Sequence, residues 1–158
     1  MHGWMKLNID GSFAENDGRT GIGMILRDSS GNPVFSACCS IKHGRSALEA
    51  EILAFKEGIT KALQWTLLPL VVETDCVAVV TLMSAKEDDR SHMVFTVMEA
   101  RRIMTGNREV KVCKIHRSQN RVSHELANYA RIHDCSLFWR DNSCNFISRL
   151  VMEDCAPD

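Results

Sequence analysis

The sequence predicts an α/β fold built on a mixed β-sheet. Three strand-like apolar runs come first and are separated by turn-forming residues, which indicates an antiparallel meander. A long segment with helical spacing follows, and after it apolar strands alternate with helices, which is typical of parallel pairing. With 158 residues, of which 45% are hydrophobic, the chain is long enough to form a single domain over residues 1–158 with a buried core.

The first three strands are marked by alternation and by a turn. In Trp4–Phe13, apolar side chains alternate with polar ones, so one face of the strand is expected to be buried. Gly21–Arg27 is a second apolar run. The segment Asp28–Asn32 contains Ser-Ser-Gly and predicts a turn, and Pro33–Ile41 then predicts the third strand.

The rest of the chain alternates between helical and extended patterns. Ser46–Trp65 carries an apolar stripe at helical spacing. Leu67–Thr74 shows little polar alternation, so it is expected to be a central parallel strand buried on both faces. The remaining elements are expected over Cys76–Ser84 (helix), His92–Thr105 (helix), Glu109–His116 (strand), Asn120–His133 (helix) and around Ile147–Glu153 (short helix).

Composition restricts the classes of function and the compartment. The net charge of −1 argues against a strongly basic nucleic-acid binder, so phosphate binding would have to be local. Seven cysteines without a Cys-x-x-Cys motif favour free thiols in a reducing intracellular compartment, the nucleus or the cytoplasm. We find no signal peptide and no stretch that would span a membrane, so no membrane partner is expected. A strand pattern begins almost at residue 1, as in a domain of a longer protein.

A zinc site is an alternative use of some of these cysteines. His133, Cys135 and Cys144 are suitable ligand types, but their spacing matches no standard zinc motif.

Three acidic residues fall in an order that indicates a two-metal nuclease. Asp10 lies in an apolar strand, Glu51 on a helix, and Asp75 at the end of another apolar run. Two Mg²⁺ ions about 4 Å apart can activate water and stabilise the leaving oxygen of a phosphodiester. Hard oxygen ligands on rigid elements hold such ions.

Each acid also has a simpler interpretation. Asp10 could be a turn residue, Glu51 an exposed helical glutamate, and Asp75 the N-cap of the following helix. Ser46 and Glu49 have the spacing of a capping box, which gives Glu49 a structural role and leaves Glu51 available for chemistry.

Four motifs in order resemble the type 1 ribonuclease H domain. They are Asp-Gly-Ser (10–12), Ala-Glu-Ile-Leu-Ala (50–54), Glu-Thr-Asp (73–75) and Arg-x-x-Asn-x-x-Ser-His-x-Leu-Ala (117–127). More closely, the chain resembles plant reverse-transcriptase-like, retroelement-derived ribonuclease H domains. The resemblance covers a core of about residues 4–133, with 134–158 as a C-terminal extension.

The resemblance implies a fold, a reaction and a site. The fold is a ribonuclease H-like α/β fold whose five-stranded mixed sheet, three antiparallel strands then two parallel, has helices on both faces. The reaction is endonucleolytic hydrolysis of the RNA strand of an RNA–DNA hybrid with two Mg²⁺ ions, or Mn²⁺. By resemblance, Asp10 bridges both ions, Glu51 and Asp75 hold the ion on the leaving-group side, and residue 124 helps to hold the ion that activates water. The candidate nucleic-acid contacts are Gly11, Ser12, Ser46, Arg117 and Asn120.

His124 departs from the family pattern, because active members usually carry Asp at that position. Mg²⁺ prefers oxygen ligands, whereas imidazole suits softer ions. His124 lies in the first turn of a predicted helix, where the helix dipole disfavours a cation. We therefore expect weakened hydrolysis, favoured by Mn²⁺; alternatively, His124 is a surface residue without a role.

Support for nucleic-acid binding is local. A basic stretch runs through residues 101–121, although Arg101 and Arg102 could equally form a solvated face. The segment Lys86–Arg90, where some family members carry a basic protrusion, is acidic. A hybrid would be recognised through its minor groove and 2′-hydroxyls.

Two functions therefore remain open. The order of the acids favours a hybrid-specific ribonuclease over an exonuclease, which would need Asp-x-Glu where Ser12 stands, and over an integrase, which would run Asp, Asp, Glu. The alternative is a catalytically degenerate domain that binds nucleic acid or a protein, including a parent polyprotein or fusion partner.

Overall fold

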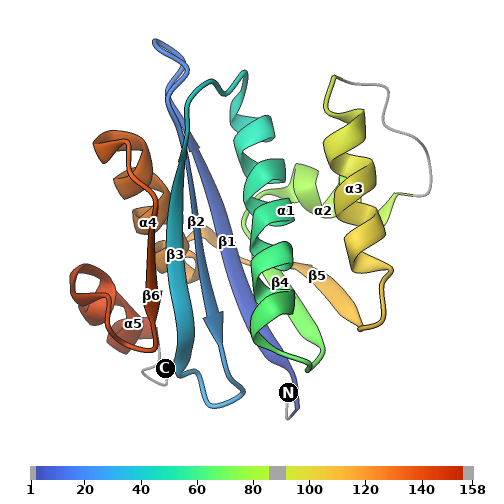
Figure 1. Cartoon of the computed structure of the whole chain (residues 1–158), viewed down its shortest axis with the longest axis vertical. Helices are drawn as coiled ribbons and strands as arrows, with labels where there is room; N and C mark the ends of the chain where they lie inside the picture. Colours follow the sequence, from blue (N-terminus) through green and yellow to red (C-terminus); the bar gives the residue numbers. More distant parts are fainter. Residues whose placement is uncertain (1–2, 86–91, 155–158) are drawn as a thin grey trace.

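The computed structural model describes residues 3–85 and 92–154 and shows one mixed sheet with helices on both faces (Figure 1). The strands are β1 (Met5–Phe13), β2 (Thr20–Arg27), β3 (Pro33–Ile41), β4 (Leu70–Thr74), β5 (Val110–Lys114) and β6 (Leu137–Arg140). They lie in the order β5-β4-β1-β2-β3-β6. The predicted antiparallel meander is present as β1–β2–β3, and β4 and β5 are parallel to β1 as expected.

The predicted number of five strands is wrong, because the sheet has a sixth strand. β6 pairs antiparallel with the edge of β3, with Ala37 opposite Phe138. The Phe138 ring stacks on Phe35 with centroids 5.3 Å apart and lies 5.2 Å from Trp65. β6 is only four residues long and largely exposed, so it has no alternation that could reveal it. Its position depends on aromatic contacts with β3 and with the end of α1.

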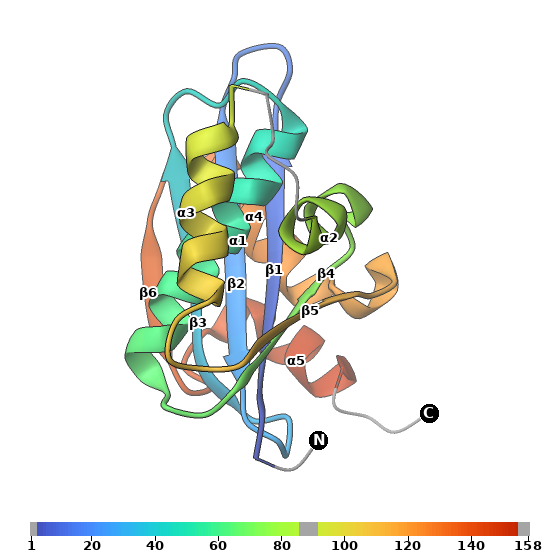
Figure 2. The same ribbon diagram turned by 90° about the vertical axis from the view of Figure 1, so that its right-hand side faces the viewer.

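Helices divide between the two faces of the sheet. One face is covered by α1 (Ala47–Trp65) and α2 (Val77–Ser84), with α3 (Val94–Met104) packed on the outer side of α1 (Figure 2). The other face is covered by α4 (Arg121–His133), and α5 (Ser148–Asp154) lies beside it (Figure 1). Short 3-10 turns, η1 (Arg117–Gln119) and η2 (Asn145–Ile147), precede α4 and α5. The predicted acidic link Lys86–Arg90 lies outside the described residues.

Each face of the sheet has its own core. The larger cluster includes Leu7, Ile9, Phe55 and Ile59, all fully buried between the sheet and α1. The smaller one joins β2 to α4 and the C-terminal segment through residues such as Ile25, Leu126 and Ile147. From Leu7 to Ser12, alternation along β1 therefore separates two environments that are both largely shielded from water, instead of a core and a solvent face.

Local capping follows the predicted signal with one difference. Ser46 is the N-cap of α1, and its hydroxyl accepts a hydrogen bond from the Glu49 amide at 3.1 Å. The Glu49 carboxylate returns to the amide of Arg45 at 2.6 Å, not to that of Ser46. Glu49 thus has the expected capping role, but it accepts from the amide one residue before the predicted one.

β4 begins at Leu70, after Pro69, instead of at Leu67, because the amide-lacking proline precedes the paired segment.

Two glycines allow the helices to approach the sheet closely. A Cβ on Gly23 of β2 would lie 2.2 Å from the Ser123 carbonyl oxygen of α4. A Cβ on Gly11 of β1 would lie 2.5 Å from the carbonyl carbon of Ala50 in α1. Gly23 is the cross-strand partner of Asp10, so both contacts surround the part of β1 that carries this acid.

Within the described ranges, every helix is too short or too polar to cross a lipid bilayer.

We expect Gly23→Ala to lower the free energy of unfolding by about 1–3 kcal/mol, because the added methyl group would meet the backbone of α4, which cannot yield without moving the helix. Urea unfolding followed by circular dichroism measures the change. Gly106→Ala is the matched control, since its Cβ would come no closer than 3.3 Å to the Ile103 oxygen. Equal stability of the two variants would show that α4 does not depend on this contact.

Candidate active site

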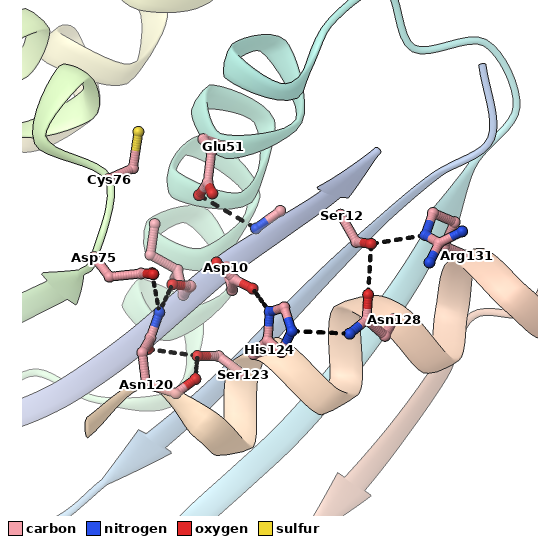
Figure 3. A network of polar contacts seen from close by, with 12 residues as sticks. Asp10, Ser12, Glu51, Asp75, Cys76, Asn120, Ser123, His124, Asn128 and Arg131 are labelled. Carbon is pink, nitrogen blue, oxygen red and sulfur yellow. Dashed lines mark hydrogen bonds and ion pairs between the residues drawn. The ribbon is translucent and has the colours of Figure 1, made fainter. Parts of the chain in front are cut away.

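The three predicted acids come from three different elements and lie near one another beside β1 (Figure 3). Asp10 lies in β1 and is only 3% exposed. Glu51 lies in the first turns of α1, and Asp75 directly follows β4. Because β1 and β4 are parallel neighbours, Asp75 emerges at the same end of the sheet as Asp10.

Glu51 reaches the site at the place where Gly11 lets α1 approach. The amide of Gly11 donates a hydrogen bond to Glu51 Oε2 at 3.2 Å. Glu51 is therefore not the exposed helical glutamate of the simpler interpretation; it faces the sheet beside Asp10.

Asp75 is held by a buried asparagine. Asn120 Nδ2 donates to Asp75 Oδ1 at 2.8 Å and to the Ile9 carbonyl oxygen at 2.9 Å. Ser123 in turn donates to Asn120 Oδ1 at 2.5 Å. The N-cap of α2 is Cys76, without a side-chain capping bond, so Asp75 is not the helix cap that its simpler interpretation required.

His124 joins the site from α4. Its Nδ1 lies 2.7 Å from Asp10 Oδ2, and its Nε2 lies 3.0 Å from Asn128 Nδ2. Both ring nitrogens therefore contact protein groups. His124 is not a surface residue without contacts, because its side chain is 31% exposed and turned towards β1.

Crowding of the carboxylates changes their acidity. Burial, together with the negative charges of Asp10 and Asp75, raises the pKa of Glu51 to about 9. Burial also raises the pKa of Asp10 to about 6; the hydrogen bond from His124 opposes this rise and the charge of Asp75 adds to it. A cation placed among these groups would relieve the repulsion and favour their ionised forms.

The donor set suits a hard divalent cation, although the site is not preassembled. In the described part of the chain, no three Asp, Glu, His or Cys side chains converge on a common point, whether the three acids or the alternative His133, Cys135 and Cys144. One oxygen each of Asp10 and Asp75 is turned towards His124 and Asn120 instead. Carboxylate oxygens and the unmet need for positive charge fit Mg²⁺ or Mn²⁺; the imidazole of His124 fits less well.

Most of the candidate nucleic-acid residues are used inside the protein. Ser46 caps α1, Gly11 packs against it, and Asn120 is 1% exposed, so its side chain is used inside the protein. Ser12 is 8% exposed and bonded to Asn128 and Arg131. Of this group only Arg117, in η1, is exposed.

Part of the basic stretch holds the fold together. The Arg101 guanidinium donates to the Leu82 carbonyl oxygen at 2.7 Å, and Arg108 donates to the Leu63 carbonyl oxygen at 2.9 Å. Lys111 pairs with Glu109 and lies over the Trp4 ring. The local positive charge available to a ligand is therefore smaller than the sequence indicated.

Two polar residues of the site, Asn128 and Arg131, were not predicted. With His124 they occupy positions i, i+4 and i+7 of α4, which places them on one helix face. Asp10 and Ser12, two residues apart in β1, share the face of the sheet that meets α4. These spacings show that each set shares one face, but only the docking of α4 on β1 brings the two sets into contact.

Comparison with known proteins agrees with the resemblance seen in the sequence. Residues 8–130 match the family described as reverse transcriptase-like. The chain is 29% identical over 129 residues to the Arabidopsis thaliana protein named "Putative ribonuclease H protein At1g65750". This match covers 81% of the chain and 20% of that relative, so the chain spans only a small part of its length.

Solved ribonuclease H structures share the fold. RNase H1 from the halophilic archaeon Halobacterium salinarum NRC-1 superposes with a TM-score of 0.76 at 20% identity, over 84% of this chain and 100% of that one. LC11-RNase H1, isolated from compost and solved with an RNA/DNA hybrid, gives a TM-score of 0.73 at 20% identity, over 82% of this chain and 98% of that one.

We expect Glu51→Gln to stabilise the metal-free protein at pH 8. Because the folded-state pKa of about 9 lies above the ordinary value of 4.5, the folded protein retains a proton that the unfolded chain releases. Stability therefore falls as the pH rises from about 4.5 towards 9, and the neutral amide removes this loss. The gain is about 1–3 kcal/mol, or roughly 2–4 °C in Tm for each kcal/mol.

Thermal unfolding in chelator at pH 5 and pH 8 measures this effect. The gain of Glu51→Gln should be larger at pH 8. Glu57→Gln, which changes an exposed glutamate of the same helix, is the control. A gain that is the same at both pH values would contradict the raised pKa of Glu51.

Proposed function

The chain belongs to the reverse transcriptase-like family, and on that premise we propose that it is a metal-dependent endonuclease that hydrolyses the RNA strand of RNA–DNA hybrids. The resemblance to type 1 ribonuclease H domains is confirmed by the family match, the Arabidopsis relative and the shared fold. The reaction, the metal and the substrate are our proposal.

One observation carries the proposal. Asp10, Glu51 and Asp75 come from three separate elements, and the pKa of Glu51 is raised by burial and further by the charges of Asp10 and Asp75 beside it. A fold gains no stability from such crowding, because buried like charges repel and lose their hydration. An arrangement that is costly without a cation and favourable with one supports a metal-dependent site.

Each residue has a distinct part in this site. Asp10, Glu51 and Asp75 would hold the ions through carboxylate oxygens. Asn120 keeps Asp75 in place, because its amide is anchored to the backbone of β1. Bound divalent ions would supply positive charge that makes a water molecule a better nucleophile and stabilises the leaving oxygen.

His124 supports a weakened activity. By the resemblance seen in the sequence, it stands where active members of the family usually carry Asp, and its two ring nitrogens already contact Asp10 and Asn128. The site therefore has three carboxylates where four are usual, and less negative charge to attract Mg²⁺. Mn²⁺, which accepts nitrogen ligands more readily, is expected to support cleavage better.

The contact between His124 and Asp10 also favours a second function. The His124–Asp10 hydrogen bond occupies an oxygen that a metal would otherwise use, as expected of a domain that has lost catalysis and retains binding. The partner would then be a nucleic acid or a protein, including another part of a longer, retroelement-derived polypeptide. The cleavage assay distinguishes the two functions.

We expect the protein to cleave a labelled RNA–DNA hybrid, faster in Mn²⁺ than in Mg²⁺. Asp10→Asn should lower the rate on the order of a thousandfold or more, because it removes the central carboxylate. Glu57→Gln, an exposed change on α1, should leave it unchanged. If the folded wild type cleaves with neither ion, the nuclease function is excluded and the binding function is favoured.

We also expect His124→Asp to raise Mg²⁺-dependent cleavage by about tenfold, because a fourth carboxylate strengthens the attraction for a hard cation. His43→Asp makes the same change at an exposed position before α1 and should have no effect. Rates with Mg²⁺ titrated for all three proteins measure this, and no gain would mean that His124 is not the weak point.

A further inference from the structure

A chain of hydrogen bonds connects Arg131 of α4 to Asp10 of β1 (Figure 3). Arg131 Nε lies 2.7 Å from Ser12 Oγ, and Ser12 Oγ lies 2.7 Å from Asn128 Oδ1. Asn128 Nδ2 lies 3.0 Å from His124 Nε2, and His124 Nδ1 lies 2.7 Å from Asp10 Oδ2. Arg131, Asn128 and His124 lie on α4, and Ser12 and Asp10 lie on the facing surface of β1.

The donors and acceptors along this chain point in one direction, and the first of them is fixed by Arg131. A guanidinium can only donate, so the oxygen of Ser12 accepts from Arg131. The Ser12 hydroxyl proton then points to Asn128 Oδ1, which accepts it. This orients the Asn128 amide with its NH₂ group towards His124, so Nε2 of the imidazole accepts and Nδ1 carries the proton.

The reverse arrangement is disfavoured by the same bonds. A proton on His124 Nε2 would face the amide protons of Asn128. Rotating that amide by half a turn would remove the acceptor of the Ser12 hydroxyl proton, and Ser12 is largely buried. The direction is therefore a property of the set and not of one bond.

We propose that Arg131, Ser12 and Asn128 form a directional relay that fixes the tautomer of His124 and makes it a hydrogen-bond donor to Asp10. His124 is then a positioning residue, which holds the central carboxylate from the α4 side, and not a ligand in the metal-free protein. Ser12 is assigned to this relay instead of to nucleic acid. The proposal deepens the nuclease function, and only its kinetic test rests on that function.

The first test is spectroscopic and needs neither metal nor activity. Nitrogen NMR of ¹⁵N-histidine-labelled, metal-free protein distinguishes protonated from unprotonated ring nitrogens. The signals of His124 are assigned among the six histidines by their loss in His124→Gln. We expect a protonated Nδ1 and an unprotonated Nε2; the opposite tautomer, or protons on both nitrogens, would overturn the relay.

A variant that reverses one bond tests the direction. Asn128→Asp replaces the donor with an acceptor, so Nε2 of His124 should become protonated. Asn107→Asp, at an exposed position between α3 and β5, adds the same charge and should leave the His124 signals unchanged. An unchanged Nε2 signal in Asn128→Asp, with a circular dichroism spectrum like that of the wild type, would contradict the relay.

The kinetic test asks whether the relay serves the reaction. Ser12→Ala should lower kcat about tenfold and leave KM within about twofold, whereas Ser12→Thr, which keeps the hydroxyl, should retain the wild-type kcat. Equal kcat values for Ser12→Ala and wild type would overturn the positioning role. If the wild type does not cleave, the nuclease function fails, while the NMR tests still decide the relay.

Discussion

The close approach of α4 to β2 is the constraint on which the site depends. A side chain on Gly23 would collide with the α4 backbone, and Gly23 lies directly opposite Asp10 in the sheet. This contact brings His124 within hydrogen-bonding distance of Asp10. On the other face of the sheet, Gly11 lets α1 approach β1 closely, and its amide donates a hydrogen bond to Glu51. Glu51 and His124 reach Asp10 because α1 lies close to the backbone of β1 and α4 lies close to that of β2.

That arrangement concentrates negative charge in a place shielded from water. As a result, the pKa values of Asp10 and Glu51 are raised. A bound cation would stabilise the ionised carboxylates. Two side chains of the protein take part of the cation's place, because Asn120 donates to Asp75 and His124 contacts Asp10. In our proposal these donors stabilise the metal-free site, and metal binding has to compete with them. A weakened enzyme and a stable empty site would then have the same physical origin.

Much of the architecture could be predicted from local patterns. Pro33–Ile41 has the predicted bounds, and the helix after Ser46 begins one residue later because Ser46 is its cap. The sixth strand could not be predicted, since its four residues are ordered by Phe35 and Trp65 from distant segments. The roles of Asn120 and Ser12 were also hidden, because their burial results from the packing of α4 on β1.

The sequence by itself determined the family, the order of the acids and the elements that carry them, because strand alternation, helix caps and motif spacing are local properties. Only the tertiary structure decided which polar groups face one another. Positions 124, 128 and 131 share a helix face, but whether that face meets solvent, nucleic acid or Asp10 depends on how α4 docks. Docking depends on backbone contacts at Gly23, and a contact between segments about a hundred residues apart leaves no periodic trace in either segment.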